Sequence, residues 1–453
     1  MKFLENKKIG IWGLGITGKS LISYLNQFSC TVSVIDQRSL NNEEKAFLKQ
    51  NNSFLSPYSS LDLFLQENDV IIPSAGIDLR PFSYFSPKFI GEIDLFCKVW
   101  QKPIIAITGT LGKTTITSFL SKILEHNNLK IATGGNIGRG LLDLTTQENT
   151  DYAVIELSSF QLELTKKLDP FLAILTNLYP NHLDRHETVE NYFQAKCNII
   201  KHQNPLHQAL VPLELAPLLR TQEWAHNRSF NFFSLQKPLP EQQVALQKND
   251  TLFYYTDQGV ITENVNQQQN IYNHQLPTSS YPLNWLIVIA ALHILNKQFL
   301  NQNLDDAIPL PEHRLELIAM YRTLSFYNDS KSTLMQATLA AVEKLQGKPL
   351  ILFLGGVSKG VDRTLFMSQL KNKVHTIFCF GAEAHLLAQA CALHAIAHFT
   401  FPTLDAAFNH AIQYAPETST LLLSPGGASF DLFKDYEERG NHFKNLVKNH
   451  GII

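Results

Sequence analysis

Residues 104–115 read IIAITGTLGKTT, and the stretch ITSFLSKIL follows at 116–124. An apolar run of strand length, a Gly-rich turn and an amphipathic stretch are together typical of a phosphate-binding loop in an α/β sheet. The loop departs from the strict pattern GxxxxGK[ST], because Ile107 stands where the first glycine is expected. Since Gly112, Lys113 and Thr114 are kept, we expect the loop amides and the helix N-terminus to wrap a polyphosphate.

The residue types around this loop predict a nucleoside triphosphate held with Mg²⁺. Lys113 would neutralise β- and γ-phosphate oxygens, and the Thr114 hydroxyl would hold Mg²⁺. The strand DYAVIE ends at Glu156, which would supply a second Mg²⁺ contact from a neighbouring strand. The residues expected to bind the nucleotide through the loop are Gly109, Thr110, Leu111, Gly112, Lys113, Thr114 and Thr115.

A second glycine-rich loop, GLGITG at 13–18, lies between a strand-like run and a helix-like run. It matches GxGxxG, and Asp36 closes the next strand about 20 residues on, as in a dinucleotide fingerprint. The physics is less specific, because small residues at a helix N-terminus admit any anionic or polar group. NAD, another nucleotide and a tight turn without a ligand all stay open at this point.

Apolar strand-like runs alternate with amphipathic stretches along the whole chain, which indicates an α/β fold with parallel sheets. Three segments, starting at 7, 103 and 349, each begin like the first strand of such a unit. We expect joints near 91–96 and 294–303. Residues 201–280 are rich in Gln and Asn and carry short β-like pieces, TLFYYT at 251–256 and GVITENV at 259–265, from which no chemistry can be inferred.

Composition excludes several classes of protein. The 453 residues are 44% hydrophobic and 17% charged with a net charge of -2, which argues against disorder and against a surface built for nucleic acid. The five cysteines fit neither a zinc site nor a disulfide framework. No run has the length of a signal peptide core or a bilayer span, so we expect a cytoplasmic protein without membrane insertion.

Eight motifs in matching order between residues 9 and 442 make the chain similar to the Mur ligase family. They are GTLGKTT (109–115), GGNIG (134–138), ELSSFQLE (156–163), NHLDRH (181–186), FQAK (193–196), HR (313–314), NDSKST (328–333) and SPGGASFDLFKDYEERG (424–440). The opening GLGITG and this ending resemble the D-glutamate-adding branch. The DNPR-type motif of the branch that adds diaminopimelate or lysine is absent from the sequence.

The resemblance implies a three-domain protein. Its parts would be a Rossmann-like domain for the UDP substrate at 1–92, a central P-loop ATPase-type domain at 93–297 and a Rossmann-like domain for the amino acid at 298–453. It implies an ATP-dependent ligase that adds D-glutamate to UDP-N-acetylmuramoyl-L-alanine through an acyl phosphate, in cytoplasmic peptidoglycan precursor synthesis. ATP, two Mg²⁺ ions and a carbamate on Lys196 would assist, and a monomer is expected.

Residue roles carry over by position in these motifs. The resemblance implies metal ligation by Thr114, Glu156, His182 and Lys196, and catalytic roles for Lys113, His182, Lys196 and Lys331. Further nucleotide contacts would come from Asn284, Arg314, Asp329 and Lys331. The UDP substrate would meet Leu14, Ile16, Thr17, Asp36, Arg38, Ser74, Gly76, Asn136, Gln161 and His182. D-glutamate would meet Arg185, Thr333, Lys359, Ser429 and Tyr436.

Four departures from the family pattern and two rival functions qualify this interpretation, and the milder two departures are Tyr436 in place of a common Phe and Gln37 beside Asp36. Asn181 stands where an acid usually precedes the histidine, and Ser280-Tyr281 replaces the usual HN pair upstream of Asn284. A nucleotide-dependent dehydrogenase would use GxGxxG and Asp36 but leaves GTLGKTT unexplained. A P-loop switch without ligase chemistry would need no UDP pocket, and the base-reading NKxD signature of GTPases is absent from the sequence.

Overall fold

The computed structural model describes residues 2–147, 149–264, 267–273, 275–277, 281–299, 311–358 and 362–451. The chain divides into two compact units, Met1–Tyr179 with Glu190–Ile308, and Pro180–Val189 with Pro309–Ile453. Three sheets lie within the ranges of the three predicted domains, and the α/β class is confirmed. The domain boundaries themselves stay predictions.

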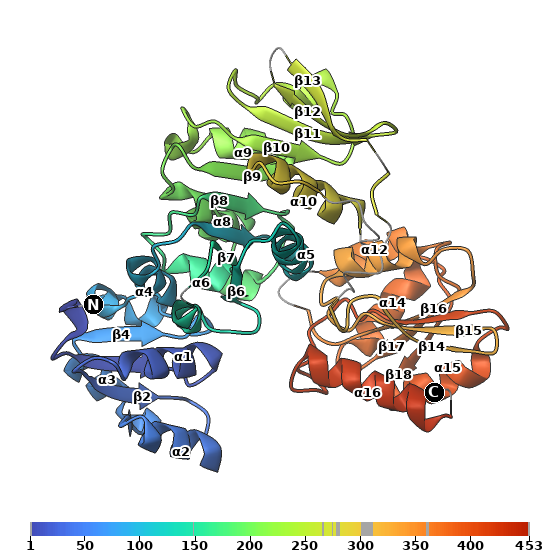
Figure 1. The fold of residues 1–453 in the computed structure, drawn as a ribbon. Helices are drawn as coiled ribbons and strands as arrows, with labels where there is room; N and C mark the ends of the chain where they lie inside the picture. Colours follow the sequence, from blue (N-terminus) through green and yellow to red (C-terminus); the bar gives the residue numbers. More distant parts are fainter. Residues whose placement is uncertain are drawn as a thin grey trace. The chain divides into compact units, whose positions relative to one another are not determined.

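The first sheet is parallel with the strand order β3-β2-β1-β4 (Figure 1). Its strands are β1 (Lys8–Trp12), β2 (Thr31–Ile35), β3 (Phe54–Leu55) and β4 (Val70–Pro73). The strand order reverses between β1 and β4, so the loops after these two strands meet at the carboxyl edge, where open α/β sheets bind ligands. The helices of this part are α1 (Ile16–Leu25), α2 (Asn42–Gln50) and α3 (Leu61–Glu67).

Helix α4 (Glu92–Val99) carries the chain from the first sheet to the second. Three of its apolar residues, Ile93, Leu95 and Phe96, are buried in one hydrophobic core that also holds residues of β1 and of the second sheet. Burial of these side chains at about 25 cal/mol per Å² ties the first sheet to the second within one unit. The predicted joint at 91–96 is therefore a packed helix.

The second sheet has nine strands in the order β13-β12-β11-β10-β9-β8-β5-β7-β6. Five of its strands are β5 (Ile104–Thr108), β6 (Ile131–Gly135), β7 (Tyr152–Glu156), β8 (Leu172–Leu175) and β9 (Gln208–Pro212), with β6 at the edge. The order places β5 between β7 and β8, so the phosphate loop is flanked by the ends of two neighbouring strands. All five of these strands pair in parallel.

Residues 201–280 extend this sheet. The added strands are β10 (Asn231–Ser234), β11 (Thr251–Thr256), β12 (Gly259–Asn264) and β13 (Gln267–Tyr272). Strands β11, β12 and β13 form an antiparallel meander, so the β-like pieces predicted at 251–256 and 259–265 are confirmed over the described residues. Helices of this part are α5 (Lys113–His126), α6 (Ser159–Glu163), α8 (Val189–Lys201), α9 (Ala216–Arg220) and α10 (Pro282–Ile294).

Helices α5 and α10 pack against each other on the second sheet. The rings of Phe119 and Trp285 stack with centroids 4.4 Å apart. Helix α10 is apolar nearly all round, as expected for a helix with little exposed surface. No helix of the described residues combines the length and apolar character needed to cross a membrane.

The third sheet has six strands in the order β14-β15-β19-β16-β17-β18, with only β14 antiparallel among the described pairs. Its strands are β14 (Glu316–Tyr321), β15 (Leu324–Asn328), β16 (Leu350–Gly355), β17 (Thr376–Phe380), β18 (His398–Phe401) and β19 (Thr420–Leu423). Its helices are α12 (Met335–Lys344), α13 (Met367–Leu370), α14 (Ala384–Leu393), α15 (Leu404–Tyr414) and α16 (Tyr436–Asn449). The second unit also contains α7 (Leu183–His186).

Candidate functional site

The phosphate loop between β5 and α5 depends on two glycines. Gly109 has φ of 148°, and a Cβ there would collide with the Thr176 hydroxyl. Gly112 has φ of 81°, and its Cβ would lie 2.8 Å from Asn284 Oδ1. Only glycine adopts both conformations without strain, so the loop can approach a ligand closely. The contact also places Asn284 of α10 directly at the loop, as the prediction for that residue requires.

Asn177, which follows β8, holds the shape of the phosphate loop. Its Oδ1 accepts the amides of Thr110 at 3.2 Å and Leu111 at 2.8 Å, and its Nδ2 donates to the Leu111 carbonyl at 3.0 Å. These amides are thereby directed into the protein, so a bound phosphate would meet those of the helix N-terminus instead. Sequence analysis missed Asn177, although its place directly after a buried strand beside the loop was an available signal.

The Lys113 ammonium lies over the loop. Its Nζ donates to the carbonyls of Gly109 at 2.9 Å and Thr110 at 3.0 Å. Thr114 and Thr115 follow in the first turn of α5, and both side chains are buried. The positive end of the helix dipole and the lysine charge therefore lie at one place, which suits an anion.

Glu156 ends β7 beside the loop, since it pairs in register with Ile107 of β5. Its side chain is buried, and its Oε1 accepts the Asn136 side-chain amide at 2.9 Å. Its Oε2 is buried with no hydrogen-bond partner among the described residues. A buried carboxylate oxygen without a partner is costly, and a cation at this oxygen would remove the cost.

The residues present fit Mg²⁺ at this position. The described residues contain no cluster of three or more His, Cys, Asp or Glu side chains that could hold a metal by itself. Mg²⁺ does not need one, because it is usually held by one or two carboxylates with phosphate oxygens and water. Glu156 with Thr114 would provide the protein part of such a site.

Lys196 of α8 is buried beneath the loop. Its Nζ donates to the Gly109 carbonyl at 2.8 Å and is 3.3 Å from Thr108 Oγ1. Burial lowers the pKa of Lys196 well below its usual value, and the charge on Lys113 lowers it further, while Glu156 opposes the shift. A lysine with a lowered pKa is neutral part of the time, which is the state that reacts with CO₂.

His182 and Arg185 lie on the segment 180–189, which belongs to the second unit. His182 is the residue before α7 and has φ of 54°, and its amide donates to Asn181 Oδ1 at 3.0 Å. Their predicted contacts with metal, UDP substrate and D-glutamate stay predictions.

Asp36 and Arg38 brace the glycine loop of the first sheet. Asp36 accepts the amides of Leu14 at 2.8 Å and Arg38 at 3.0 Å. The Arg38 guanidinium donates to the Leu14 carbonyl and to Glu44, both at 2.8 Å. The Asp36 carboxylate therefore already accepts a hydrogen bond from the loop. This favours a ligand that lies beside the loop over a ligand that the loop amides surround.

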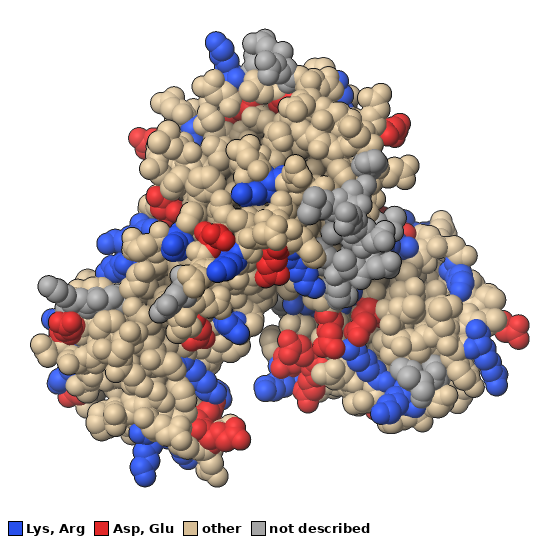
Figure 2. Space-filling model, viewed as in Figure 1, with Lys and Arg blue, Asp and Glu red and all other residues tan. Residues whose placement is uncertain are grey.

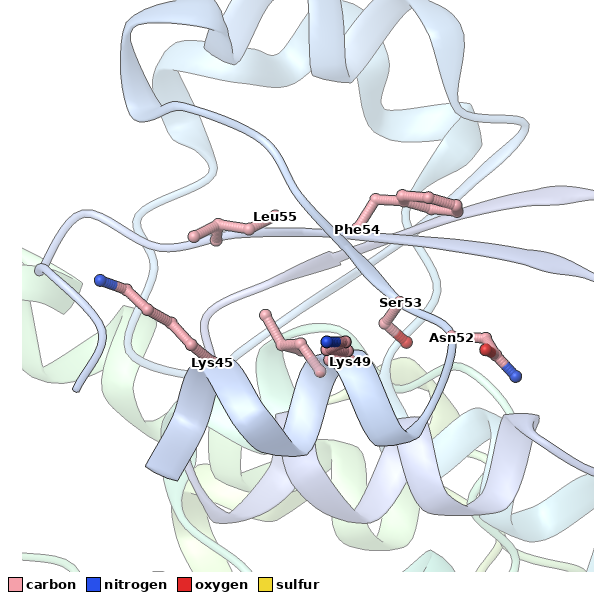
Figure 3. A pocket seen from close by; sticks show the side chains of 7 residues that line it. Lys45, Lys49, Asn52, Ser53, Phe54 and Leu55 are labelled. Carbon is pink, nitrogen blue, oxygen red and sulfur yellow. The ribbon is translucent and has the colours of Figure 1, made fainter. Parts of the chain in front are cut away.

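The remaining predicted residues of this pocket lie around the same edge. Ser74, after β4, donates from its hydroxyl to the Gly13 carbonyl at 3.3 Å. Ile16 is 63% exposed, and a Cβ at Gly76 would meet nothing within 4 Å, so both border open space. The hollow in Figure 3 is a different one, lined by Lys45, Lys49 and Phe54 between α2 and the edge strand β3, and none of the predicted residues lines it.

Thr17 and Gln161 line one small cavity together with Glu92. Gln161 is held by a capping box at the start of α6, where its Oε1 accepts the Ser158 amide at 3.0 Å. Thr17 comes from α1 and Gln161 from α6, which follows β7 of the second sheet, so this cavity joins two parts of the predicted UDP-substrate site. Asn136 is exposed, and its side-chain amide donates to Glu156.

In the second unit, the loop after β15 carries Asp329, Lys331 and Thr333, and the loop after β19 carries Ser429. The Asp329 amide donates to the Leu423 carbonyl at 2.7 Å, and the Gly426 amide donates to the Ser332 carbonyl at 2.9 Å. The Lys331 ammonium lies 5.0 Å from the centre of the Tyr436 ring. Ser429 is buried in the second loop, and Thr333 ends the first. Lys359 lies outside the described residues.

Asp329 is buried with its carboxylate bonded inside the unit. It accepts the Leu315 amide at 3.0 Å and the Ser424 hydroxyl at 2.7 Å. Burial raises its pKa to about 6, while these hydrogen bonds and the charge on Arg314 oppose the rise. Arg314 Nε is buried without a hydrogen-bond partner among the described residues, so this guanidinium keeps a donor for a ligand. The predicted nucleotide contact of Asp329 stays a prediction.

Arg439 of α16 joins the two loops and was not assigned from the sequence. Its side chain is fully buried, and it donates to the Ser330 hydroxyl at 3.0 Å, the Ser330 carbonyl at 2.8 Å and the Gly427 carbonyl at 3.0 Å. Burial lowers its pKa to about 10, so it is still a cation at neutral pH.

Figure 2 shows acidic and basic side chains intermixed on the face of the molecule that it presents.

Two family models match this chain. The Mur ligase middle domain matches residues 107–292, and the Mur ligase MurD-like N-terminal domain matches residues 7–83. The UDP-N-acetylmuramoylalanine--D-glutamate ligase of Protochlamydia amoebophila is 32% identical over 457 residues, which cover 98% of both chains. The chain belongs to the Mur ligase family.

Other Mur ligases match over a similar length. The relative of the same printed name from Acidobacterium capsulatum is 31% identical, with 99% of this chain and 97% of the relative covered. Among solved structures, a pseudomurein peptide ligase type C from Methanothermus fervidus has a TM-score of 0.58 at 15% identity, covering 98% of this chain and all of that one. A MurF ligase from Thermotoga maritima in complex with ADP has a TM-score of 0.56 at 15% identity, covering 99% of this chain and 97% of that one. These structures confirm the Mur ligase fold.

Proposed function

We propose that this chain is an ATP-dependent ligase that adds D-glutamate to UDP-N-acetylmuramoyl-L-alanine in peptidoglycan precursor synthesis. The observation that carries the proposal is the match of nearly the full chain to relatives named for this reaction. The phosphate loop on β5, with the unpaired Glu156 oxygen at the adjacent strand end, gives the chemistry a physical basis.

The reaction needs activation because a carboxylate is a poor electrophile at neutral pH. The substrate carboxylate attacks the γ-phosphate of ATP and becomes an acyl phosphate with release of ADP. The amine of D-glutamate then attacks the acyl carbon, and a tetrahedral intermediate collapses to the amide and inorganic phosphate. Each step concentrates negative charge, so cations and oriented dipoles must collect there.

Residues of the first unit, together with His182 of the second, would supply that stabilisation. Lys113 and the N-terminus of α5 hold the triphosphate, and Asn177 fixes the loop that presents them. Thr114 and Glu156 would hold the first Mg²⁺, while His182 and a carbamate on Lys196 would hold the second. The chemistry supplied by bound Mg²⁺ is neutralisation of phosphate charge. The buried Lys196 amine, whose pKa is lowered, supports the carbamate.

The UDP substrate would use the glycine loop and its neighbours in the first sheet, with Asn136 and Gln161 closer to the reacting end. Arg314, Asp329 and Lys331 would contact the nucleotide from the second unit, and Thr333, Lys359, Ser429, Tyr436 and Arg185 would hold D-glutamate. Holding three reactants in place replaces a termolecular encounter.

We further propose that the protein is a cytoplasmic monomer. Size-exclusion chromatography with light scattering would check the monomeric state.

A matrix of D- and L-amino acids tests the function directly. Each acid is supplied with ATP, Mg²⁺ and UDP-N-acetylmuramoyl-L-alanine, and the product mass and phosphate release are measured. The proposal requires phosphate release that needs both substrates, and a product heavier by one glutamyl residue with D-glutamate. Phosphate release without either substrate would indicate a P-loop switch, and reduction of NAD without ATP would indicate a dehydrogenase.

A further inference from the structure

Glu92 lies where the chain passes from the first sheet to the second, at the first residue of α4. Its Oε1 accepts the Leu141 amide at 2.9 Å, and its Oε2 accepts the Thr17 hydroxyl at 3.4 Å. One carboxylate thus bonds to the glycine loop of the first sheet and to a backbone amide of the second-sheet part.

Both partners of Glu92 sit next to predicted substrate residues. Thr17 belongs to the loop 13–18, which follows β1. Leu141 follows the turn 135–140, which is closed by a hydrogen bond from the Gly135 amide to the Arg139 carbonyl at 2.9 Å and carries Asn136. Since Asn136 bonds to Glu156, the link from Thr17 through Glu92 and this turn ends at the candidate metal position.

The burial of this carboxyl group calls for an explanation. Glu92 is only 7% exposed, it borders the cavity shared with Thr17 and Gln161, and it forms no salt bridge with the described residues. Burial raises its pKa to about 7, with the Asp143 charge adding to the rise while Leu141 and Thr17 oppose it. An apolar side chain would fill the same space at lower cost, so packing alone does not account for an acid here.

We propose that Glu92 is a positioning residue that fixes the spacing between the loop 13–18 and the turn 135–140. The inference rests on the proposed function and deepens it. The uridine end of the substrate would bind at the first loop, and its carboxylate end would reach the second sheet past Asn136 and Gln161. Glu92 would then couple the binding of the two ends of one molecule without contacting the reacting atoms.

Asp94 provides a matched control on the same helix. It is buried to a similar degree, at 8% exposed, but it accepts hydrogen bonds from the Thr165 hydroxyl at 2.6 Å and the Lys166 amide at 3.0 Å. Replacing it therefore removes a buried acid and its bonds from α4 and leaves the Thr17 to Leu141 link in place.

The test compares the binding of two ligands by calorimetry on the full chain without ATP. UDP has only the uridine end of the substrate, whereas UDP-N-acetylmuramoyl-L-alanine has both the uridine end and the carboxylate end. Glu92→Ala should change the Kd for UDP by less than about twofold and raise the Kd for the full substrate about tenfold. Glu92→Gln keeps an acceptor for Leu141 and should restore most of the affinity. Asp94→Ala should lower thermal stability without changing the ratio of the two affinities.

Equal changes for both ligands, or no change for either, would overturn the positioning role. Should Glu92→Ala fail to fold, Glu92→Asp gives the same comparison, because it keeps the carboxyl group and shortens the reach by one methylene. A wild-type chain that does not bind the full substrate would instead count against the proposed function, so the two failures are distinguishable.

Discussion

The side chain of Asn177 pairs with the backbone of Leu111 in both directions, accepting its amide at 2.8 Å and donating to its carbonyl at 3.0 Å. No other residue type of this length both accepts and donates in such a plane except aspartic acid in its protonated form. The phosphate loop therefore takes its shape from a residue 66 positions away in the chain.

Asn177→Ala should raise KM for ATP about tenfold, because the loss of buried hydrogen bonds of about 1 kcal/mol each frees the loop. UDP-substrate affinity should stay unchanged. Steady-state kinetics with ATP varied at saturating UDP substrate measures the effect. Unaltered KM and kcat would show that the loop keeps its shape without Asn177.

Lys113→Ala should abolish turnover, since the cation that neutralises β- and γ-phosphate oxygens is gone. Its Nζ donates to carbonyls of the phosphate loop. The glycine loop of the first sheet is a separate part of the chain, so UDP-substrate binding should survive. Lys122→Ala, on the same helix, is the control and should keep activity. Full turnover of the Lys113 variant would contradict the assigned role.

For Lys196, the expectation is loss of activity in Lys196→Ala with partial recovery on addition of acetate. The added carboxylate would replace the oxygen ligands that a carbamate on the Lys196 amine would supply. Activity is measured over a series of acetate concentrations, with chloride at equal ionic strength as control. Complete activity of the variant without acetate would exclude the carbamate.

Arg439→Lys should destabilise the second unit by about 3 kcal/mol, because lysine cannot make three donations from one planar group and a buried network is left incomplete. Urea unfolding of the full chain, followed by a probe in the second unit, measures the loss. KM for D-glutamate should rise as well, since Ser330 and Gly427 lie on the two loops that carry the predicted contacts. The exposed Arg322→Lys serves as control, and equal stability of the two variants would disagree with this prediction.

Glu92 also predicts a pH dependence of stability. Its pKa is raised from 4.5 to about 7 in the folded chain, so the folded state holds a proton that the unfolded state has lost between these values. The favourable contribution is complete below about pH 4.5 and is lost as pH rises to about 7, by roughly 3 kcal/mol in total. Relative to wild type, Glu92→Gln should therefore gain stability over this range and level off above it. A difference in the free energy of unfolding between Glu92→Gln and wild type that does not change with pH would refute the raised pKa of Glu92.

Local patterns in the sequence predicted the α/β class and the phosphate loop, because strand, glycine turn and helix are adjacent in the chain. The position of Asn177 after a buried strand was a signal for a site residue, but its role and that of Arg439 depend on hydrogen bonds to residues far away in sequence. The strands at 251–256 and 259–264 were expected as pieces, but their place in the second sheet depends on the pairing of β11 with β10, about 20 residues earlier in the chain. Asp36 and Asp329 were predicted to face ligands, and the carboxylates of both also accept backbone amides from other segments of the chain, those of Leu14 and Leu315.

Transfer of phosphate from ATP to the substrate carboxylate is the central step of the proposed reaction. Supplying UDP-N-acetylmuramoyl-L-alanine with ¹⁸O in its alanyl carboxylate, together with ATP and D-glutamate, tests this step through the mass of the released phosphate. We expect one labelled oxygen in the inorganic phosphate for each amide formed. Amide product accompanied by unlabelled phosphate would contradict both an acyl phosphate intermediate and the proposed role of the phosphate loop.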